Sequence, residues 1–152
     1  MNTKILNDLE LEPVEMAEGT VLIREGSDNM NVYILVSGKV EVTMRGSSIA
    51  VVDRTGVALG QVAVILGKQP VATTTVLEPS TFYVISDFLT FLRDHPDACV
   101  STAQELAGQM VSSVNHMVWM KEQLAELQKN MEVYVPAFPD PGDESPAPGS
   151  AG

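Results

Sequence analysis

Residues 60–75 read GQVAVILGKQPVATTT, and the interpretation of the whole chain depends on this short stretch. Gly60 suits a tight turn, the apolar residues after it suit a short helix, and the threonines after Pro70 suit a strand. A glycine turn that leads into a helix presents backbone N–H groups, which attract anions such as phosphate. The stretch contains no arginine and no carboxylate. It therefore predicts either a ligand site or a purely structural turn that binds nothing.

The sequence around this stretch, from about Glu10 to Ile85, has the pattern of β-structure. Short runs of Val, Ile, Leu and Thr alternate with segments rich in the Gly, Asn, Asp, Ser and Pro that turns use. The predicted strands are TVLI, NVYILV, KVEVTM, IAVVD and TFYVI, and the predicted turns are EGSDN, SGK, RGSS and LEPS. Regular short strands of this kind indicate a sandwich or a barrel.

Two helical segments follow the predicted strands. Residues 86–100 favour a helix with Ser86 as its N-cap and an interruption near Pro96. Residues 101–131 contain no proline, and Thr102 with Glu105 fits a capping box at the start of one long helix.

The long helix carries apolar side chains in two offset seven-residue series, weakened at Ser113. The apolar members are Leu106, Met110, Met117, Met120, Leu124, Leu127 and Met131. This a/d-type seam favours a contact with the same helix of a second chain, and packing on the chain's own roll is the alternative. We therefore expect a roll with its short helix over 1–100, a dimerisation helix over 101–131, and a disordered tail rich in Pro and acidic residues over 132–152.

Charge and composition exclude several classes of function. Nine Lys and Arg against 20 Asp and Glu give a net charge of −11, and the basic residues are scattered, so direct nucleic-acid binding is not expected. One cysteine allows no internal disulfide. We find no signal peptide and no apolar run of membrane-spanning length, so we expect a cytoplasmic protein without membrane contact.

Catalytic and metal-binding patterns are not evident. His95 and His116 are the two histidines, and Cys99 alone cannot hold an iron–sulfur cluster. No Ser-His-Asp or Cys-His arrangement is found, so we expect neither enzymatic activity nor a metal site. A haem or redox sensor that uses one of the two histidines is the weakest alternative.

Residues 18–42, EGTVLIREGSDNMNVYILVSGKVEV, resemble the opening β-roll of cyclic nucleotide-binding domains, as in bacterial catabolite-activator regulators and protein kinase A regulatory subunits. The matching marks are Gly19, Arg24-Glu25-Gly26, Tyr33 and Ser37-Gly38-Lys39-Val40. The resemblance covers about Leu11 to Met131. It implies an α+β, mainly β fold: a jelly-roll-like β-roll with a short cassette helix, followed by a long C-terminal dimerisation helix.

Within this resemblance, residues 60–75 fall where the family has its phosphate-binding cassette. The family cassette reads approximately Gly-Glu-apolar-Ala-apolar and then Pro-Arg-x-Ala-Thr. The glutamate that accepts the ribose 2′-hydroxyl is replaced by Gln61, and the arginine that clamps the cyclic phosphate is replaced by Val71. Losing a buried charged partner of this kind costs about 2–5 kcal/mol. The resemblance thus implies cAMP or cGMP as a weakly bound ligand, or a different nucleotide-like ligand.

The candidate ligand-binding residues combine the resemblance with local structure. Backbone amides open the predicted helix, Lys68 is a candidate substitute cation, and strand alternation puts Thr73 and Thr75 on the same face as Val71. The set is Gly60, Gln61, Val62, Ala63, Lys68, Val71, Ala72, Thr73 and Thr75.

Two functions follow from these expectations. The first is a non-enzymatic, homodimeric sensor with weak or altered ligand binding in the roll. The second is a ligand-free dimerisation or adaptor module with a vestigial pocket and a protein partner. The activators carry a DNA-binding domain after the long helix, and we expect this chain to lack one.

Overall fold

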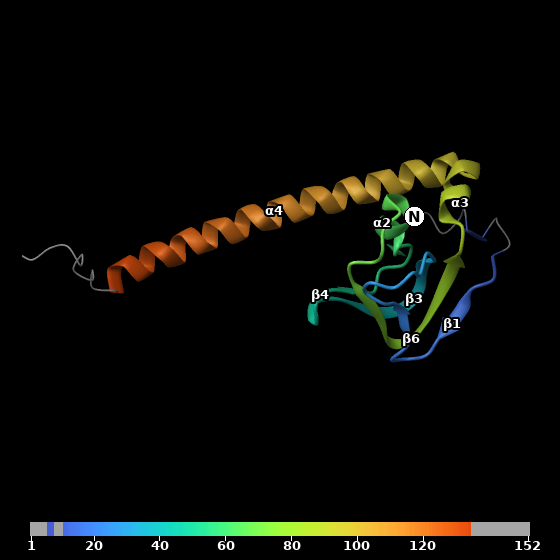
Figure 1. Cartoon of the computed structure of the whole chain (residues 1–152), viewed down its shortest axis with the longest axis horizontal. Coiled ribbons are helices and arrows are strands. Elements are labelled where there is room, and N and C mark those ends of the chain that lie inside the picture. Colours follow the sequence, from blue (N-terminus) through green and yellow to red (C-terminus); the bar gives the residue numbers. More distant parts are fainter. Residues whose placement is uncertain (1–5, 8–10, 135–152) are drawn as a thin grey trace, which may run out of the picture. The chain divides into compact units, whose positions relative to one another are not determined.

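The computed structural model of the chain describes residues 6–7 and 11–134, which divide between two compact units, Met1–Ala107 and Gly108–Gly152 (Figure 1). The elements follow the predicted order of strands, short helix, strand and helices. They are β1 (Val14–Met16), β2 (Val21–Ile23), β3 (Val32–Met44), β4 (Ser47–Val52), β5 (Ala58–Leu59), α2 (Gln61–Leu66), β6 (Thr73–Ile85), α3 (Phe88–Asp94) and α4 (Pro96–Tyr134). None of the described helices is long and apolar enough to cross a membrane.

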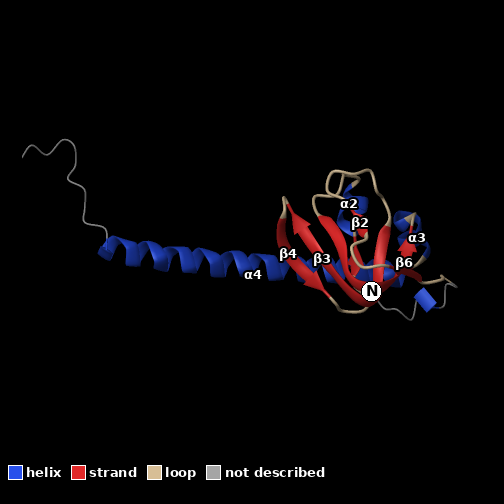
Figure 2. Ribbon diagram, turned by 90° about the horizontal axis from the view of Figure 1, so that it is seen from below, coloured by secondary structure: helices blue, strands red, loops and turns tan. Residues whose placement is uncertain are grey.

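The strands form one antiparallel sheet built around β3 and β6, which are 13 residues long each (Figure 2). These two strands pair from Val32 opposite Ile85 to Thr43 opposite Thr73. β5 and β4 pair with the first and second halves of β3, while β2 and β1 pair with the first and second halves of β6. The sheet therefore folds over as the predicted roll.

Two predicted turns lie inside these long strands, so the prediction of turns at Ser37–Lys39 and Leu77–Ser80 is wrong. The register between β3 and β6 shifts at these points instead of ending. Gly38 has a positive φ of 102°, and a Cβ on it would lie 2.0 Å from Oγ of Ser80. That hydroxyl accepts a hydrogen bond from the Lys39 amide at 3.0 Å. The turn-forming residues therefore build a bulge that bends both strands together.

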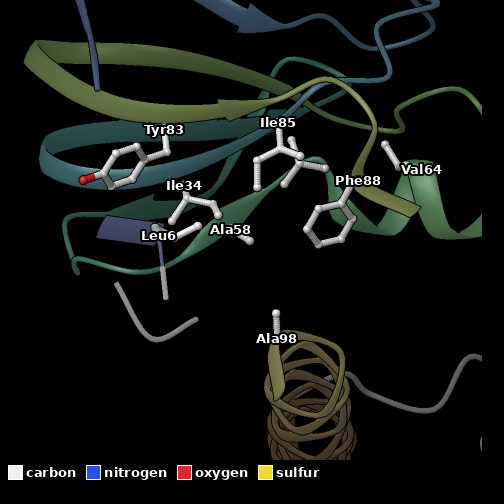
Figure 3. Close-up of a cluster of buried hydrophobic side chains, with 9 residues drawn as sticks. Leu6, Ile34, Ala58, Val64, Tyr83, Ile85, Phe88 and Ala98 are labelled. Carbon is white, nitrogen blue, oxygen red and sulfur yellow. The ribbon is translucent and has the colours of Figure 1, made fainter. Parts of the chain in front are cut away.

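The core consists of two clusters on opposite faces of β3. Alternation along the strand sends Val32 and Ile34 to one cluster and Tyr33 and Leu35 to the other. The first cluster joins the sheet to α2, α3 and α4 and contains Leu6, Val32, Ile34, Ala58, Val64, Tyr83, Ile85, Phe88 and Ala98 (Figure 3). The second contains Leu22, Ile23, Tyr33, Leu35, Val40, Leu59, Val76 and Phe82.

The helix boundaries correct two predictions. The N-cap of α3 is Asp87 and not Ser86, because the Asp87 carboxylate accepts the Thr90 N–H at 3.1 Å. The long helix α4 begins at Pro96, five residues before the predicted start at Ser101, since proline is well suited to the first helical position.

Thr102 therefore lies inside α4 and caps nothing. The residue is 2% exposed, and its hydroxyl has no hydrogen-bond partner within the described part of the chain. At its other end α4 continues to Tyr134. From residue 135 on, the predicted disordered tail lies outside the described residues.

Candidate functional site

The turn at the start of residues 60–75 requires glycine for two independent reasons. Gly60 has φ +90° and precedes α2 directly, a backbone conformation that residues with a side chain rarely adopt. A Cβ at this position would also lie 2.8 Å from Cδ1 of Ile23 and 2.9 Å from the carbonyl oxygen of Asn31. The backbone of the turn is thus packed directly against β2 and the loop before β3.

Two polar side chains of this segment are at least nine-tenths buried. Gln61 opens α2 and Thr74 is the second residue of β6, and each is 4% exposed. In the described residues, the fully buried side-chain atoms without a hydrogen-bond partner are Ser27 Oγ and Thr102 Oγ1, and no atom of Gln61 or Thr74 is among them. Buried amides and hydroxyls normally find such a partner in the protein, in water or in a ligand. Gln61 and Thr74 are therefore the two buried polar residues of the cassette.

Sequence reasoning named Gln61 but not Thr74. Alternation from Val71 predicts that Thr73 and Thr75 line the pocket, yet β6 begins only at Thr73. Val71 lies outside the strand and its side chain is 65% exposed. The available signal for Thr74 was the family pattern itself, whose final threonine falls on this residue.

The remaining cassette threonines and the lysine have other surroundings. The Thr73 hydroxyl accepts the Glu25 N–H at 3.0 Å and so ties the strand to the loop before β3. Thr75 is half-buried opposite Glu41 of β3. Lys68 is exposed in the turn that ends α2, where its backbone N–H donates to Ala63 at 3.0 Å. Val62 is 45% exposed, and Ala63 and Ala72 are half-buried.

An open cavity of about 380 Å³ lies at the end of the segment. It brings Val71 and Gln69 together with Met44 at the end of β3, with Arg45 from the β3–β4 connection and with Glu25. The Glu25 carboxylate accepts the backbone N–H of Arg45 at 3.1 Å. The cation that shares a cavity with Val71 is thus Arg45, which sequence reasoning did not select, because it lies 26 positions earlier in the chain.

The described part of the chain contains no cluster of side chains suited to bind a metal ion. No group of three or more His, Cys, Asp and Glu residues lies close enough together there to hold an ion. His95 stacks on Phe91 with ring centroids 4.7 Å apart, and its Nδ1 lies 2.8 Å from the Phe91 carbonyl oxygen. His116 stacks on Trp119 along α4, with centroids 5.8 Å apart. Each histidine thus has an aromatic neighbour one helical turn away.

The predicted seam of α4 is an exposed apolar stripe. Its side chains are between 46% and 66% exposed: Met110, Met117, Met120, Leu124, Leu127 and Met131. Charges balance along residues 108–131, which contain two lysines, Lys121 and Lys129, and two glutamates, Glu122 and Glu126. In a chain of net charge −11, this stretch is a neutral apolar surface.

Comparison with known proteins identifies the roll. The model of the family described as "Cyclic nucleotide-binding domain" matches residues 13–95, more than half of the chain. No curated protein sequence matches the chain.

Solved structures show the same fold at low sequence identity. The catabolite activator protein of Thermus thermophilus is 17% identical with a TM-score of 0.65, over 80% of this chain and 60% of that one. The N-terminal domain of a transcriptional regulator from Streptomyces coelicolor A3(2) is 20% identical with a TM-score of 0.54, over 74% and 86%. The regulatory subunit of a cAMP-independent protein kinase A from Trypanosoma brucei is also 20% identical, with a TM-score of 0.54, over 68% and 44%. These likenesses confirm the predicted roll followed by a long helix.

Proposed function

We propose that this chain, which belongs to the cyclic nucleotide-binding domain family, senses a small nucleotide-like ligand in its roll and works as a homodimer through α4. Domains of this family are typically regulatory modules without catalytic activity. The proposal combines two parts of the molecule that are tested separately, the cassette and the stripe of α4.

The observation that carries the sensor function is the pair of buried polar side chains in the cassette. Gln61 and Thr74 are each 4% exposed, and both lie in the cassette. Buried amides and hydroxyls normally make a hydrogen bond with the protein, with water or with a ligand. A hydroxyl-rich ligand supplies that partner. The amide oxygen of Gln61 then accepts a hydrogen bond from a ligand hydroxyl. The Thr74 hydroxyl donates or accepts a second hydrogen bond.

Weak binding follows from the position of Val71. A bidentate guanidinium suits a cyclic phosphate, and a valine at 65% exposure offers it no donor. The loss corresponds to roughly 30- to several-thousand-fold in affinity. We therefore propose weak binding of cAMP or cGMP, or preference for a related ligand with less charge.

A calorimetric titration of the full chain with cAMP and cGMP, up to about millimolar ligand, tests this function. We expect wild type to saturate weakly and Val71→Arg to bind roughly 30-fold more tightly or better. Gln61→Leu should abolish saturation while the roll remains folded. Val14→Arg is the matched control, because it places the same charge at an exposed valine on β1. Absence of saturation in both wild type and Val71→Arg would exclude the cyclic-nucleotide sensor.

The second candidate is a ligand-free dimerisation or adaptor module. It is favoured by the exposure of Val71 and by the Thr73 hydroxyl, which already accepts the Glu25 N–H. The two candidates differ in one outcome of the same titration. A folded dimer that binds neither nucleotide, even with Val71→Arg, would support the adaptor.

The homodimer is supported by the character of the stripe. Strongly acidic chains repel each other, so a second copy fits best against a surface without net charge. Residues 108–131 are such a surface, and a helix of this length spans about 36 Å. Light scattering of the purified chain over a dilution series tests the assembly. A mass equal to one chain at every concentration would exclude the homodimer.

A further inference from the structure

Methionine is concentrated in the exposed stripe of α4. The chain has eight methionines, and four of them are Met110, Met117, Met120 and Met131, here called the methionine stripe. Their side chains are 64%, 66%, 46% and 61% exposed. Leucine packs a helical seam with better-defined rotamers, whereas methionine is flexible and its sulfur can be oxidised.

We propose that the methionine stripe is a reversible oxidation site whose modification by peroxides separates the homodimer. This inference rests on the dimer proposed above and adds its regulation. The four sulfurs lie at seam positions, so a change in their polarity acts directly on the contact between the two chains.

The reaction is a two-electron transfer of one oxygen atom. The thioether sulfur attacks the terminal oxygen of a hydroperoxide, the O–O bond breaks, and an S–O bond forms. The sulfur is oxidised, and the peroxide is reduced to water or an alcohol after its proton moves to the leaving oxygen. The product, methionine sulfoxide, is polar and is reduced again by methionine sulfoxide reductases.

A sulfoxide in the seam weakens association because its oxygen must be buried without a donor. Burial of an unpaired polar group corresponds to roughly 5- to 150-fold in an equilibrium constant. Two-fold symmetry places each methionine of the stripe in the contact twice, so oxidation of both copies counts twice. Modification of several members of the stripe therefore suffices to dissociate the dimer.

The dimer also controls how fast the reaction proceeds. Sulfurs covered in the seam react only when the two chains separate, so oxidation traps the single chain. Raising the protein concentration lowers the fraction of single chains and slows oxidation of the stripe. Met30, which is 42% exposed in the loop before β3, lies outside the stripe and should react at a rate independent of concentration.

The experiment uses the full chain with Cys99→Ser, which removes the exposed thiol as a competing site. Hydrogen peroxide is added at two protein concentrations that differ about 100-fold, and peptide mass spectrometry follows each methionine over time. Light scattering reports the mass. We expect stripe oxidation to be slower at the higher concentration, the dimer to be lost as it proceeds, and reductase treatment to restore it.

Methionine-to-leucine variants show which methionines cause the loss of the dimer in peroxide. The quadruple Met→Leu variant of the stripe should remain dimeric in peroxide, whereas Met30→Leu should dissociate like the parent. The double variant Met117→Leu/Met120→Leu should show intermediate loss, and it also serves if the quadruple variant misfolds.

The outcomes separate the two proposals. A single chain before peroxide is added would refute the dimer itself. A dimer that persists with sulfoxides in the stripe would refute the inference and leave the dimer intact. Dissociation of the folded quadruple variant in peroxide would also refute the inference, because another residue would then be responsible.

Discussion

The roll and the C-terminal part of α4 use the same kinds of side chains in opposite ways. In the roll, large apolar residues such as Phe82, Phe88 and Ile34 are fully buried. Along residues 108–131 of α4, the large apolar side chains are about half exposed or more. Helices gain most of their stability from packing of an apolar face. The roll thus completes its core within one chain, whereas in the proposed function the stripe packs against a second one.

The largest effect should come from opening a cavity in the roll. Phe88→Ala removes a fully buried ring from the cluster that joins the sheet to the helices, and we expect a loss of about 3–5 kcal/mol in the free energy of unfolding. Urea unfolding followed by circular dichroism measures it. Leu127→Ala, at a side chain that is 58% exposed, is the control. Equal losses from both variants would contradict the comparison between the two regions.

The next effect concerns the stripe. Leu124→Glu places a charge in the predicted seam, and we expect the dimer to weaken at least about 100-fold, or 2.7 kcal/mol, because a charge is costly to bury unpaired. Analytical ultracentrifugation measures the dissociation constant, while urea unfolding of the roll should change little. Ala125→Glu adds the same charge one position off the seam. If it dissociates the dimer equally, the heptad assignment of the seam is wrong.

A smaller effect should distinguish the cassette turn from an ordinary turn. Gly60→Ala forces a Cβ to within 2.9 Å of the Asn31 carbonyl oxygen at a φ of +90°, and we expect a loss of about 2 kcal/mol. Gly67→Ala is the matched control, because Gly67 also has a positive φ but has open space around it. Urea unfolding compares the two variants. Similar losses would show that backbone conformation alone, and not close packing, makes Gly60 necessary.

The sequence predicted features that depend on local chemistry. The apolar runs of the roll, the glycine before α2 and the helix break near Pro96 are each set by a few adjacent residues. The turns predicted at Ser37–Lys39 and Leu77–Ser80 do contain turn-forming residues. In the structure these residues form a bulge within β3 and β6. Gly38 takes a positive φ in a turn and in a bulge alike, and only the close approach of Ser80 distinguishes them.

The features that escaped prediction depend on contacts between distant segments. Whether Thr73 or Thr74 faces inward depends on where β6 begins, and a shift of one residue exchanges the faces of a strand. Arg45 shares a cavity with Val71 because the β3–β4 connection and the loop carrying Glu25 meet there. The hydrophobic periodicity of one segment contains no information on its contacts with distant segments.

The smallest effect is electrostatic and belongs to the roll. The Thr90 N–H and side chain hydrogen-bond the Asp87 carboxylate and lower its pKa below 3.8, and Arg93 adds a minor attraction. A lowered folded-state pKa means that this stabilisation is complete above the unfolded value and is lost as pH falls through the folded one. Asp87→Asn keeps a capping oxygen but removes the charge.

We therefore expect wild type to resist urea slightly better than Asp87→Asn at about pH 7, with the difference shrinking as the pH falls through the lowered pKa of Asp87. Asp53→Asn, at an exposed aspartate in the connection after β4, should show no such difference. Because the stripe over 108–131 contributes equal numbers of Lys and Glu, this charge effect should appear in unfolding of the roll and leave association through α4 unchanged. A difference between wild type and Asp87→Asn in the dissociation constant of the dimer would show that the two regions are coupled.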